Sequence, residues 1–122
     1  MKTLLVAACL LVAACVTEDF VNEHASPFGL GCRGRDAYRD RLPGFFATFA
    51  GLRYRPDGAA LVDGDRVALP YVMTAVVAGT ALRVRGLWLL TLRDGLVASR
   101  LDYWDSAAVP KPPGRAEPAG GG

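Results

Sequence analysis

The sequence predicts a small α+β domain in which a helix is followed by an antiparallel sheet. The helix is indicated after Asp36, where aromatic and apolar side chains recur at helical spacing. The sheet is indicated by residues 66–77 and 82–93, two runs in which apolar side chains alternate with period two. Asp94-Gly95 follows the second run and favours a tight hairpin turn, because such a turn needs positive φ angles. Three consecutive antiparallel strands are therefore expected in the second half of the chain.

Length and composition limit the classes of protein that the chain can represent. Its 122 residues are enough for one domain, and 52% apolar with 21% charged residues is typical of a folded chain. A net charge of +2 on scattered basic residues gives no reason to expect a nucleic acid partner. There is no phosphate-binding loop, dinucleotide fingerprint or paired-cysteine zinc spacing, so we expect neither a cofactor nor a metal.

Residues 1–15 have two interpretations. They contain a six-residue repeat, at 4–9 and again at 10–15, and each copy ends in cysteine. A lysine, a short apolar run and small residues before Cys15 are typical of a bacterial lipoprotein signal, which would give a secreted or membrane-anchored protein. We favour a helix that stays attached to the domain, and a cytoplasmic location, because acidic residues follow the run without a flexible linker.

Between this segment and the sheet, the sequence predicts a short strand, a loop and the helix. Residues 20–24 have an extended pattern, and residues 25–34 are rich in glycine. Asp36 suits the first turn of the helix, since an acid favours the positive end of the helix dipole. Pro43 lies inside the helical pattern and should kink or split the helix. The apolar face of this helix is expected to be core, and consists of Tyr38, Leu42, Phe45, Phe46 and Phe49.

The remaining segments complete one domain. Residues 52–62 look like a strand that is interrupted at 56–58, and residues 78–80 form a reversal between the two long runs. Pro70 indicates that its strand is an edge or is bulged there, because proline cannot donate a ladder hydrogen bond. From residue 107 to 122 proline and glycine dominate, and we expect a disordered tail.

The order of these segments resembles the SnoaL-like branch of the nuclear transport factor 2 superfamily over about residues 16–106. The resemblance is carried by EDFVNEH (18–24), GRDAY (34–38), DGDRVA (63–68) and the stretch from Asp94-Gly95 to Tyr103-Trp104-Asp105. It implies a cone-like α+β barrel, in which a strongly curved antiparallel sheet wraps against N-terminal helices and encloses a pocket. Members include polyketide cyclases, ketosteroid isomerases, relatives of limonene-epoxide hydrolase and proteins with no known activity.

Asp102 is the first candidate catalytic residue. Residues 102–105 are similar to the end of the epoxide hydrolases, and this resemblance places Asp102 at their catalytic aspartate, facing inward beside Trp104. The charged form of a carboxylate on an apolar wall is disfavoured, as a general base that works near neutral pH requires. Two alternatives remain open, an ordinary ion pair with Arg100 on the same strand face and simple exposure of the carboxylate.

His24 and Tyr71 are the other candidate catalytic residues. His24 is the only histidine and would share a strand face with Asn22, and the resemblance puts both at the pocket wall. A neutral imidazole could relay a proton near pH 7, although a structural hydrogen-bonding role is the alternative. Tyr71 could donate a hydrogen bond to a carbonyl or enolate oxygen, or be a core aromatic. Leu69 and Tyr71 stand where epoxide hydrolases keep an arginine and an aspartate, so only a generic acid/base pocket is implied.

The pocket is expected to bind a small apolar molecule, such as a polyketide- or terpenoid-like compound. We expect isomerase, cyclase or hydrolase chemistry on that compound. A non-catalytic ligand-binding module and a lipid-anchored structural protein are the alternatives. The residues expected to bind the ligand are Asn22, Phe46, Met73, Leu82, Val84 and Trp104.

A homodimer is expected through the outer face of the sheet. Arg83, Arg85 and Arg93 share one strand parity and predict a solvated face, with an anion-binding or subunit-contact stripe as the alternative. Leu87 and Leu89 have the same parity and leave apolar area uncovered. A domain of this size buries only roughly 60–68% of its surface, so a second copy would cover this area. Dimers are also common in the resembled superfamily.

Overall fold

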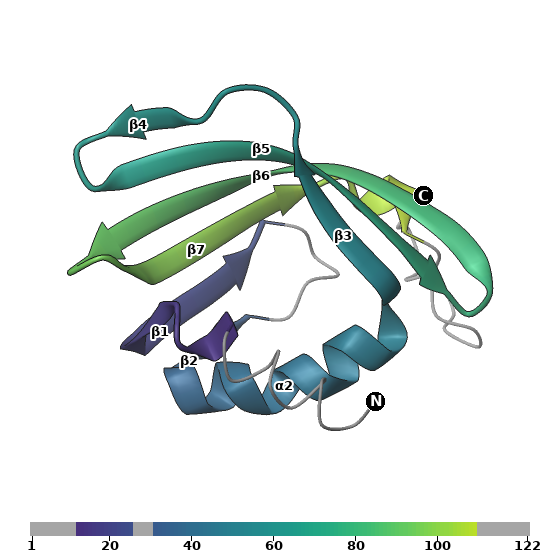
Figure 1. The fold of residues 1–122 in the computed structure, drawn as a ribbon, viewed down its shortest axis with the longest axis horizontal. Helices are drawn as coiled ribbons and strands as arrows, with labels where there is room; N and C mark the ends of the chain where they lie inside the picture. Colours follow the sequence, from purple (N-terminus) through teal and green to yellow (C-terminus); the bar gives the residue numbers. More distant parts are fainter. Residues whose placement is uncertain (1–11, 26–30, 110–122) are drawn as a thin grey trace, which may run out of the picture.

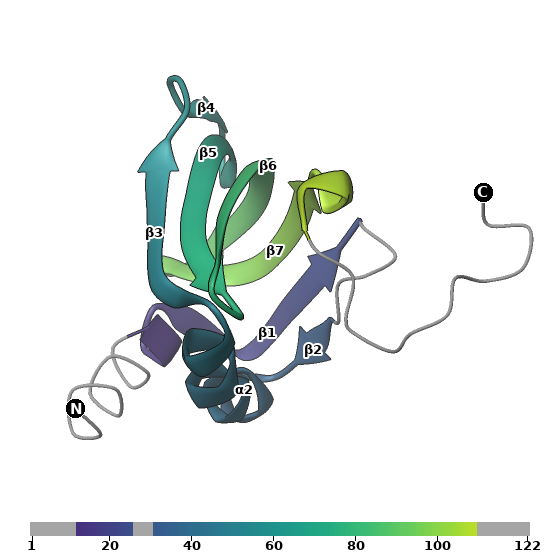
Figure 2. The same ribbon diagram turned by 90° about the vertical axis from the view of Figure 1, so that its right-hand side faces the viewer.

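The structure is a computed structural model and describes residues 12–25 and 31–109. A strongly curved sheet wraps around the 14-residue helix α2, which contacts β1 and β2 on one side and β3 on the other (Figure 1, Figure 2). In chain order the elements are β1 (Val16–His24), β2 (Cys32–Arg33), α2 (Arg35–Thr48), β3 (Ala50–Pro56), β4 (Leu61–Asp63), β5 (Arg66–Val77), β6 (Thr80–Arg93), β7 (Leu96–Trp104) and the 3₁₀ turn η1 (Ser106–Ala108).

The sheet has the strand order β2-β1-β7-β6-β5-β3, and β4 pairs with β5 on the same side as β3. All neighbouring strands are antiparallel except β1 and β7, which are parallel. The α+β fold class with a strongly curved sheet is thus confirmed, and so are the three consecutive antiparallel strands β5, β6 and β7 (Figure 2). The parallel pair brings β1, which carries His24, beside the last strand of the chain.

Both predicted hairpin turns are confirmed by backbone angles. Ala78 and Gly79 have φ angles of 49° and 80°, and Asp94 and Gly95 have φ angles of 53° and 77°. Two successive positive φ angles match the twist of the flanking strands, whereas ordinary turns would splay them. These turns set the register in which β6 lies between β5 and β7.

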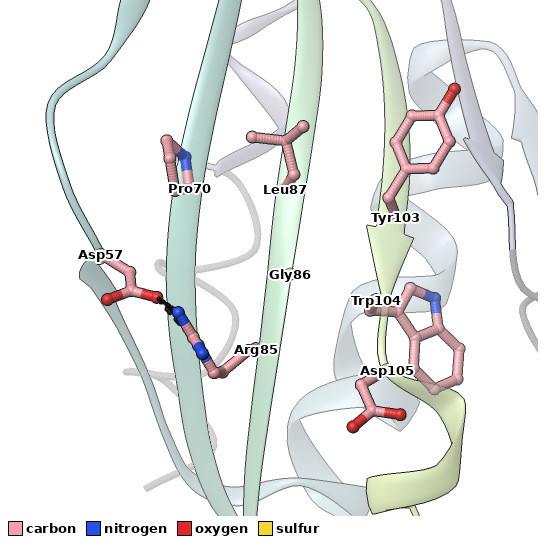
Figure 3. Close-up of a pocket in the computed structure, with 8 residues that line it drawn as sticks. All are labelled: Asp57, Pro70, Arg85, Gly86, Leu87, Tyr103, Trp104 and Asp105. Carbon is pink, nitrogen blue, oxygen red and sulfur yellow. Dashed lines mark hydrogen bonds and ion pairs between the residues drawn. The ribbon is translucent and has the colours of Figure 1, made fainter.

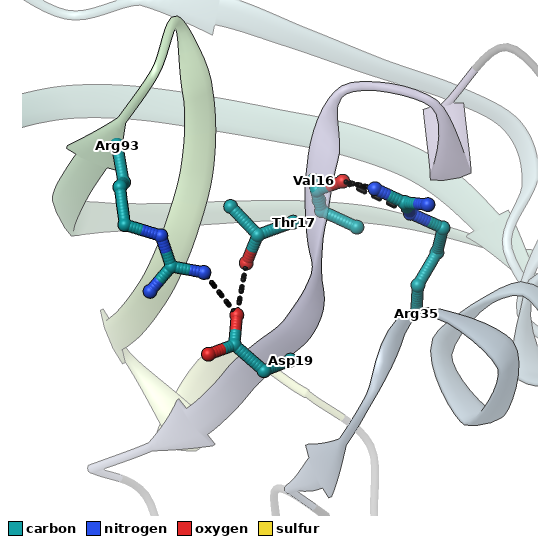
Figure 4. A network of polar contacts seen from close by, with 5 residues as sticks. All are labelled: Val16, Thr17, Asp19, Arg35 and Arg93. Atoms are coloured by element: carbon teal, nitrogen blue, oxygen red, sulfur yellow. Dashed lines mark hydrogen bonds and ion pairs between the residues drawn. The ribbon is translucent and has the colours of Figure 1, made fainter.

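The start of β1 is held in place by side chains from other elements. Arg35 of α2 donates to the Val16 carbonyl from Nε at 3.1 Å and from Nη2 at 2.8 Å (Figure 4). The Thr17 hydroxyl donates to Asp19 Oδ1 at 2.8 Å, and Arg93 of β6 donates to the same oxygen. The strand begins at Val16 rather than at residue 20, where the sequence pattern placed its start. The loop expected over residues 25–34 contains the short strand β2.

The two prolines inside regular elements have different consequences. Helix α2 is continuous from Arg35 to Thr48, so Pro43 does not split it. Pro43 is exposed, and water can satisfy the carbonyl that lacks a donor. Pro70 pairs with Leu87 on β6, but on its other side it lies between the stretches of β5 that pair with β3 and with β4. On that side the Pro70 carbonyl accepts a hydrogen bond from the Asp57 N–H at 3.0 Å. The position of the missing Pro70 N–H therefore faces the gap between β3 and β4. At this point β5 is locally an edge strand, as predicted.

Two clusters of buried side chains form the core. The first joins α2 to β1 and consists of Val16, Phe20, Tyr38 and Leu42. The second lies on the inner face of β5 and β6 and consists of Tyr71, Met73, Ala75, Leu82 and Val84. Ala108 and Val109 pack against the second cluster, so ordered structure continues past residue 106.

The ends of the chain are described only in part. Of the segment expected to form an N-terminal helix, residues 12–15 are described, Ala13 is buried and Val12 packs against the first cluster. Residues 1–11 and the tail from residue 110 lie outside the described residues. Within the ranges that the structure describes, no helix is long and apolar enough to cross a membrane.

Candidate functional site

Asp102 is a buried carboxylate on the inner face of β7. Its exposed fraction is 6%, whereas that of the adjacent Tyr103 is 44%. The residues of β7 that face inward therefore include Arg100, Asp102 and Trp104. The strand pattern favoured neither face, and the alternative in which the carboxylate is simply exposed is wrong.

Tyr71 reaches Asp102 from β5, across the strand between them. The Tyr71 hydroxyl donates to Asp102 Oδ1 at 2.5 Å. Tyr71 pairs with Gly86 on β6, and Gly86 pairs with Trp104 on β7. Because Gly86 has no side chain, the Tyr71 ring lies over it, and a Cβ on Gly86 would come within 2.3 Å of the ring's Cζ. Burial, and then the hydrogen bond to the Asp102 carboxylate, raise the pKa of Tyr71 far above its ordinary value, so the hydroxyl stays a donor.

His24 lies beside Asp102 as a neutral ring. Its Nδ1 is 3.8 Å from Asp102 Oδ2, which is within the range of an ion pair. However, Trp104 Nε1 donates to the same Nδ1 at 3.0 Å, and a nitrogen that accepts this bond carries no proton. Burial lowers the pKa of His24, and Arg100 and Arg41 lower it further, although Asp102 opposes them. The hydrogen bond and the direction of the pKa therefore agree on a neutral imidazole rather than an ion pair.

This neutral state predicts a loss of stability in weak acid. The folded pKa of His24 lies below its ordinary value of 6.5, so the unfolded chain binds more protons as the pH falls through 6.5. The free energy of unfolding should then decrease over that interval. In His24→Gln, whose amide oxygen can accept from Trp104, the decrease between about pH 7 and about pH 5.5 should become smaller. Urea unfolding of both proteins at the two pH values measures this, and an equal decrease in the variant would contradict a neutral His24.

Arg100 does not pair with Asp102. Its Nε donates to Asn22 Oδ1 at 3.2 Å, and its Cζ lies 5.2 Å from the centroid of the Trp88 ring. The rings of Phe20 and Tyr38 lie at 5.9 Å and 5.5 Å from the same atom. Among the described residues no carboxylate forms a salt bridge with Arg100, so the alternative reading of Asp102 as its ion-pair partner is wrong.

An aromatic wall faces this polar group from β3, β5 and β6. The rings of Tyr54, Tyr71 and Trp88 lie with their centroids 4.8 to 5.2 Å apart. Burial raises the pKa of Tyr54 to about 12, although 38% of the residue is exposed, because its ring packs against the other two. Trp88 Nε1 is buried and has no hydrogen-bond partner in the described part of the chain. The sequence reading did not single out Tyr54, Trp88 or Arg100 as site residues, although Arg100 has the strand parity of Asp102.

The predicted ligand-binding residues fall into two places. Asn22 is buried beside Arg100, and Trp104 contacts both His24 and the second core cluster. Met73, Leu82 and Val84 belong to that cluster together with Tyr71. Phe46 packs against the first cluster instead. The structure thus brings Asp102, Tyr71, His24, Asn22 and Trp104 together and places Phe46 apart from them.

An open pocket of about 430 Å³ lies elsewhere, at the outer face of the sheet (Figure 3). Pro70, Leu87 and Tyr103 form one row of it across three strands, and Arg85 Nη2 donates to Asp57 Oδ2 at 2.9 Å. Its lining includes Trp104 but none of the three candidate catalytic residues. We therefore place the candidate site on the inner face. Among the residues that the structure describes, no three potential ligands lie together as a metal site would require.

Comparison with known proteins agrees with this fold. Solved structures with the same fold include a hypothetical protein with a ketosteroid isomerase-like fold from Catenulispora acidiphila, in complex with trimethylamine, with a TM-score of 0.75, 19% identity, and coverage of 83% of this chain and 78% of that one. A putative SnoaL-like polyketide cyclase from Jannaschia has a TM-score of 0.70, 20% identity, and coverage of 82% and 74%. An LEH-like epoxide hydrolase from M. tuberculosis has a TM-score of 0.70, 17% identity, and coverage of 88% and 77%.

At these identities the likeness shows the fold alone. None of the curated proteins searched matches the chain. A model of the SnoaL-like domain matches residues 11–100, which is most of the 122-residue sequence and ends within β7. The chain therefore belongs to the SnoaL-like domain family.

Proposed function

We propose that the protein catalyses acid/base chemistry, of the isomerase or cyclase type, on a small and largely apolar compound such as a polyketide- or terpenoid-like molecule. One observation carries the proposal. Asp102 is a buried carboxylate that is oriented by a tyrosine hydroxyl and paired with no cation among the described residues. Such a group is suited to take a proton from carbon, because it is held in position and no cation neutralises it.

The proposed mechanism uses the two oxygens of Asp102 differently. Oδ1 accepts from Tyr71, which fixes the plane of the carboxylate. Oδ2 is 3.8 Å from the nearest His24 nitrogen, too far for a hydrogen bond, and so can accept a proton from a carbon next to a carbonyl. The protonated carboxyl group then returns the proton to another atom of the substrate. His24 stays neutral and holds Trp104, and Tyr71 acts as a positioning residue.

The relatives give this proposal its substrate class. The Jannaschia structure is described as a putative SnoaL-like polyketide cyclase, and the M. tuberculosis structure as an LEH-like epoxide hydrolase. Epoxide opening fits this chain less well, because Tyr71 and Leu69 stand where the resembled hydrolases keep charged residues. Proton transfer at an acidic carbon needs only the base that is present.

A turnover screen tests the proposal against a ligand-binding role. Small ketones and β-dicarbonyl compounds are incubated with the protein, and exchange of the acidic hydrogen for deuterium is followed by NMR as a function of pH. A general base predicts exchange that depends on pH and on the presence of Asp102. Compounds that raise the melting temperature without any exchange would identify a binding module instead.

We also propose that two copies associate through the outer face of the sheet, where Leu87, Leu89, Leu101 and Tyr103 form adjacent cross-strand pairs. Tyr103 is 44% exposed. Light scattering at tens of micromolar should give the mass of a dimer, and Leu89→Arg should give a monomer because the charge would be buried without a partner. Val76→Arg, at the far end of β5 on the same face, is the control. A monomer before any substitution would overturn this proposal.

A cytoplasmic location and an attached N-terminal segment remain proposals of the same kind. The intact mass of the protein from its own host decides between them and the lipoprotein alternative. Loss of the residues before Cys15 together with a lipid on that cysteine would support the alternative.

A further inference from the structure

Arg100 is a half-buried cation on the sheet's concave side, and only one of its N–H donors has a partner among the described residues. A guanidinium group has five N–H donors. Of these, only the Nε–H has a partner, Asn22 Oδ1 at 3.2 Å. Its two terminal nitrogens donate to no atom of the described residues, and no carboxylate among them forms a salt bridge with it.

The surroundings of Arg100 stabilise a positive charge but do not neutralise it. Three rings lie around Cζ at 5.2 to 5.9 Å, and their π faces attract the cation. Asp102, on the same strand face, holds Tyr71 instead. The positive charge of Arg100 is therefore not cancelled by a neighbouring carboxylate, and it contributes to lowering the pKa of His24.

A second donor belongs to the ring that lies nearest to the same guanidinium. Trp88 Nε1 is buried without a partner, and the Trp88 ring is the one nearest to Arg100 Cζ. Buried donors without acceptors are rare in folded proteins, because each costs the free energy of its lost hydration. The buried Trp88 N–H and the half-buried Arg100 fork, which water can reach, therefore offer donors to an acceptor from outside the chain.

We propose that Arg100 binds a carboxylate group of the substrate, so that the substrate is a small planar acid rather than a wholly apolar compound. This inference rests on the proposed function, because it assumes that one end of the substrate binds Arg100 while the other end reacts at Asp102. The planar fork of a guanidinium matches the two oxygens of a carboxylate. Trp88 and Tyr54 provide flat apolar surfaces for the body of the molecule.

The spacing along β7 sets the length of that compound. Arg100 and Asp102 are two residues apart on one strand face, which corresponds to about 7 Å. A carboxylate at Arg100 thus leaves the reacting carbon, at the other end of the molecule, beside Asp102. The negative charge of the compound then lies at the opposite end of the molecule from the carbon that reacts.

Calorimetry with three probes of similar shape tests the proposal on the full chain. Benzoate carries the carboxylate, benzamide is its neutral counterpart, and benzyltrimethylammonium is a cation. Benzoate should bind about 10- to 100-fold more tightly than benzamide, as expected for charge-assisted hydrogen bonds. The cation should bind more weakly than either. Equal affinity for benzoate and benzamide, or no benzoate binding at millimolar concentration, would overturn the proposal.

Variants then assign the preference to Arg100. Arg100→Gln should abolish the preference for benzoate, and Arg100→Lys should keep part of it, because lysine retains the charge but loses the fork. Arg83→Gln, an exposed arginine on β6, should leave it unchanged. An Arg100→Gln protein that keeps the preference would refute the assignment. If that variant does not fold, the comparison of Arg100→Lys with the unmodified protein decides, since an unchanged preference there contradicts bidentate binding.

A last arm separates this inference from the proposed function. Asp102→Asn should bind benzoate at least as tightly as the unmodified protein, because it removes a negative charge from the site. Tight benzoate binding in a protein whose deuterium exchange does not depend on Asp102 would support the anion site and reject the general base. Exchange that depends on Asp102, without any preference for benzoate, would reject the anion site alone.

Discussion

Asp102→Asn is expected to lower the rate of proton transfer by about 10²–10⁴-fold, the usual effect of removing a positioned general base. The shape of the site should not change. An asparagine can still accept the Tyr71 hydroxyl through its Oδ1, and its amide nitrogen takes the place of Oδ2. The buried charge disappears, which offsets the weaker hydrogen bond, so the free energy of unfolding should change by about 1 kcal/mol or less.

Asp105→Asn is the matched control for this substitution. Asp105 is exposed and caps η1 by accepting from the Ala107 N–H at 3.1 Å, and asparagine caps a helix equally well. Its exchange rate and melting temperature should therefore stay those of the unmodified protein. A folded Asp102→Asn protein with an undiminished rate of proton transfer would show that Asp102 is not the base.

The sheet could be predicted because its determinants are local. Period-two patterns mark the strands, and the turns at Ala78 and Asp94 need positive φ angles that glycine at the next position helps to provide. The gap beside Pro70 could be anticipated in the same way, since it follows from a missing N–H. The parallel pairing of β1 with β7 was not predicted, because it depends on contacts between distant segments.

The site was predicted less completely for the same reason. On β7 both parities carry apolar and polar side chains, so only contacts with other strands decide that Asp102 faces inward. Whether Arg100 neutralises it depends on Asn22 of β1 and on the rings of Phe20 and Tyr38, which lie far away in the sequence. Local spacing alone therefore left the ion pair open, and the structure rejects it.

Gly86→Ala is expected to lower the free energy of unfolding by about 1–3 kcal/mol, because it adds a methyl group where the Tyr71 ring crosses β6. The new Cβ would lie 2.3 Å from Tyr71 Cζ and Oη and 2.8 Å from the Tyr103 carbonyl oxygen. The ring cannot turn aside at little cost, since Tyr71 is 4% exposed and packs against both Tyr54 and Trp88. The carbonyl is part of β7 and can move only with the strand.

The same change should separate Tyr71 from Asp102 and reduce proton transfer, although neither residue is altered. Gly44→Ala is the matched control, because a Cβ there meets nothing within 4 Å and alanine favours the interior of α2 by about 0.5–1 kcal/mol. The two substitutions should thus shift the urea midpoint in opposite directions. In a Tyr71→Leu background, where the ring is absent, the cost of Gly86→Ala should shrink. Equal costs in both backgrounds would show that the Tyr71 ring does not rest on Gly86. They would contradict the proposal that Tyr71 of β5 crosses β6 at Gly86 to orient the Asp102 carboxylate.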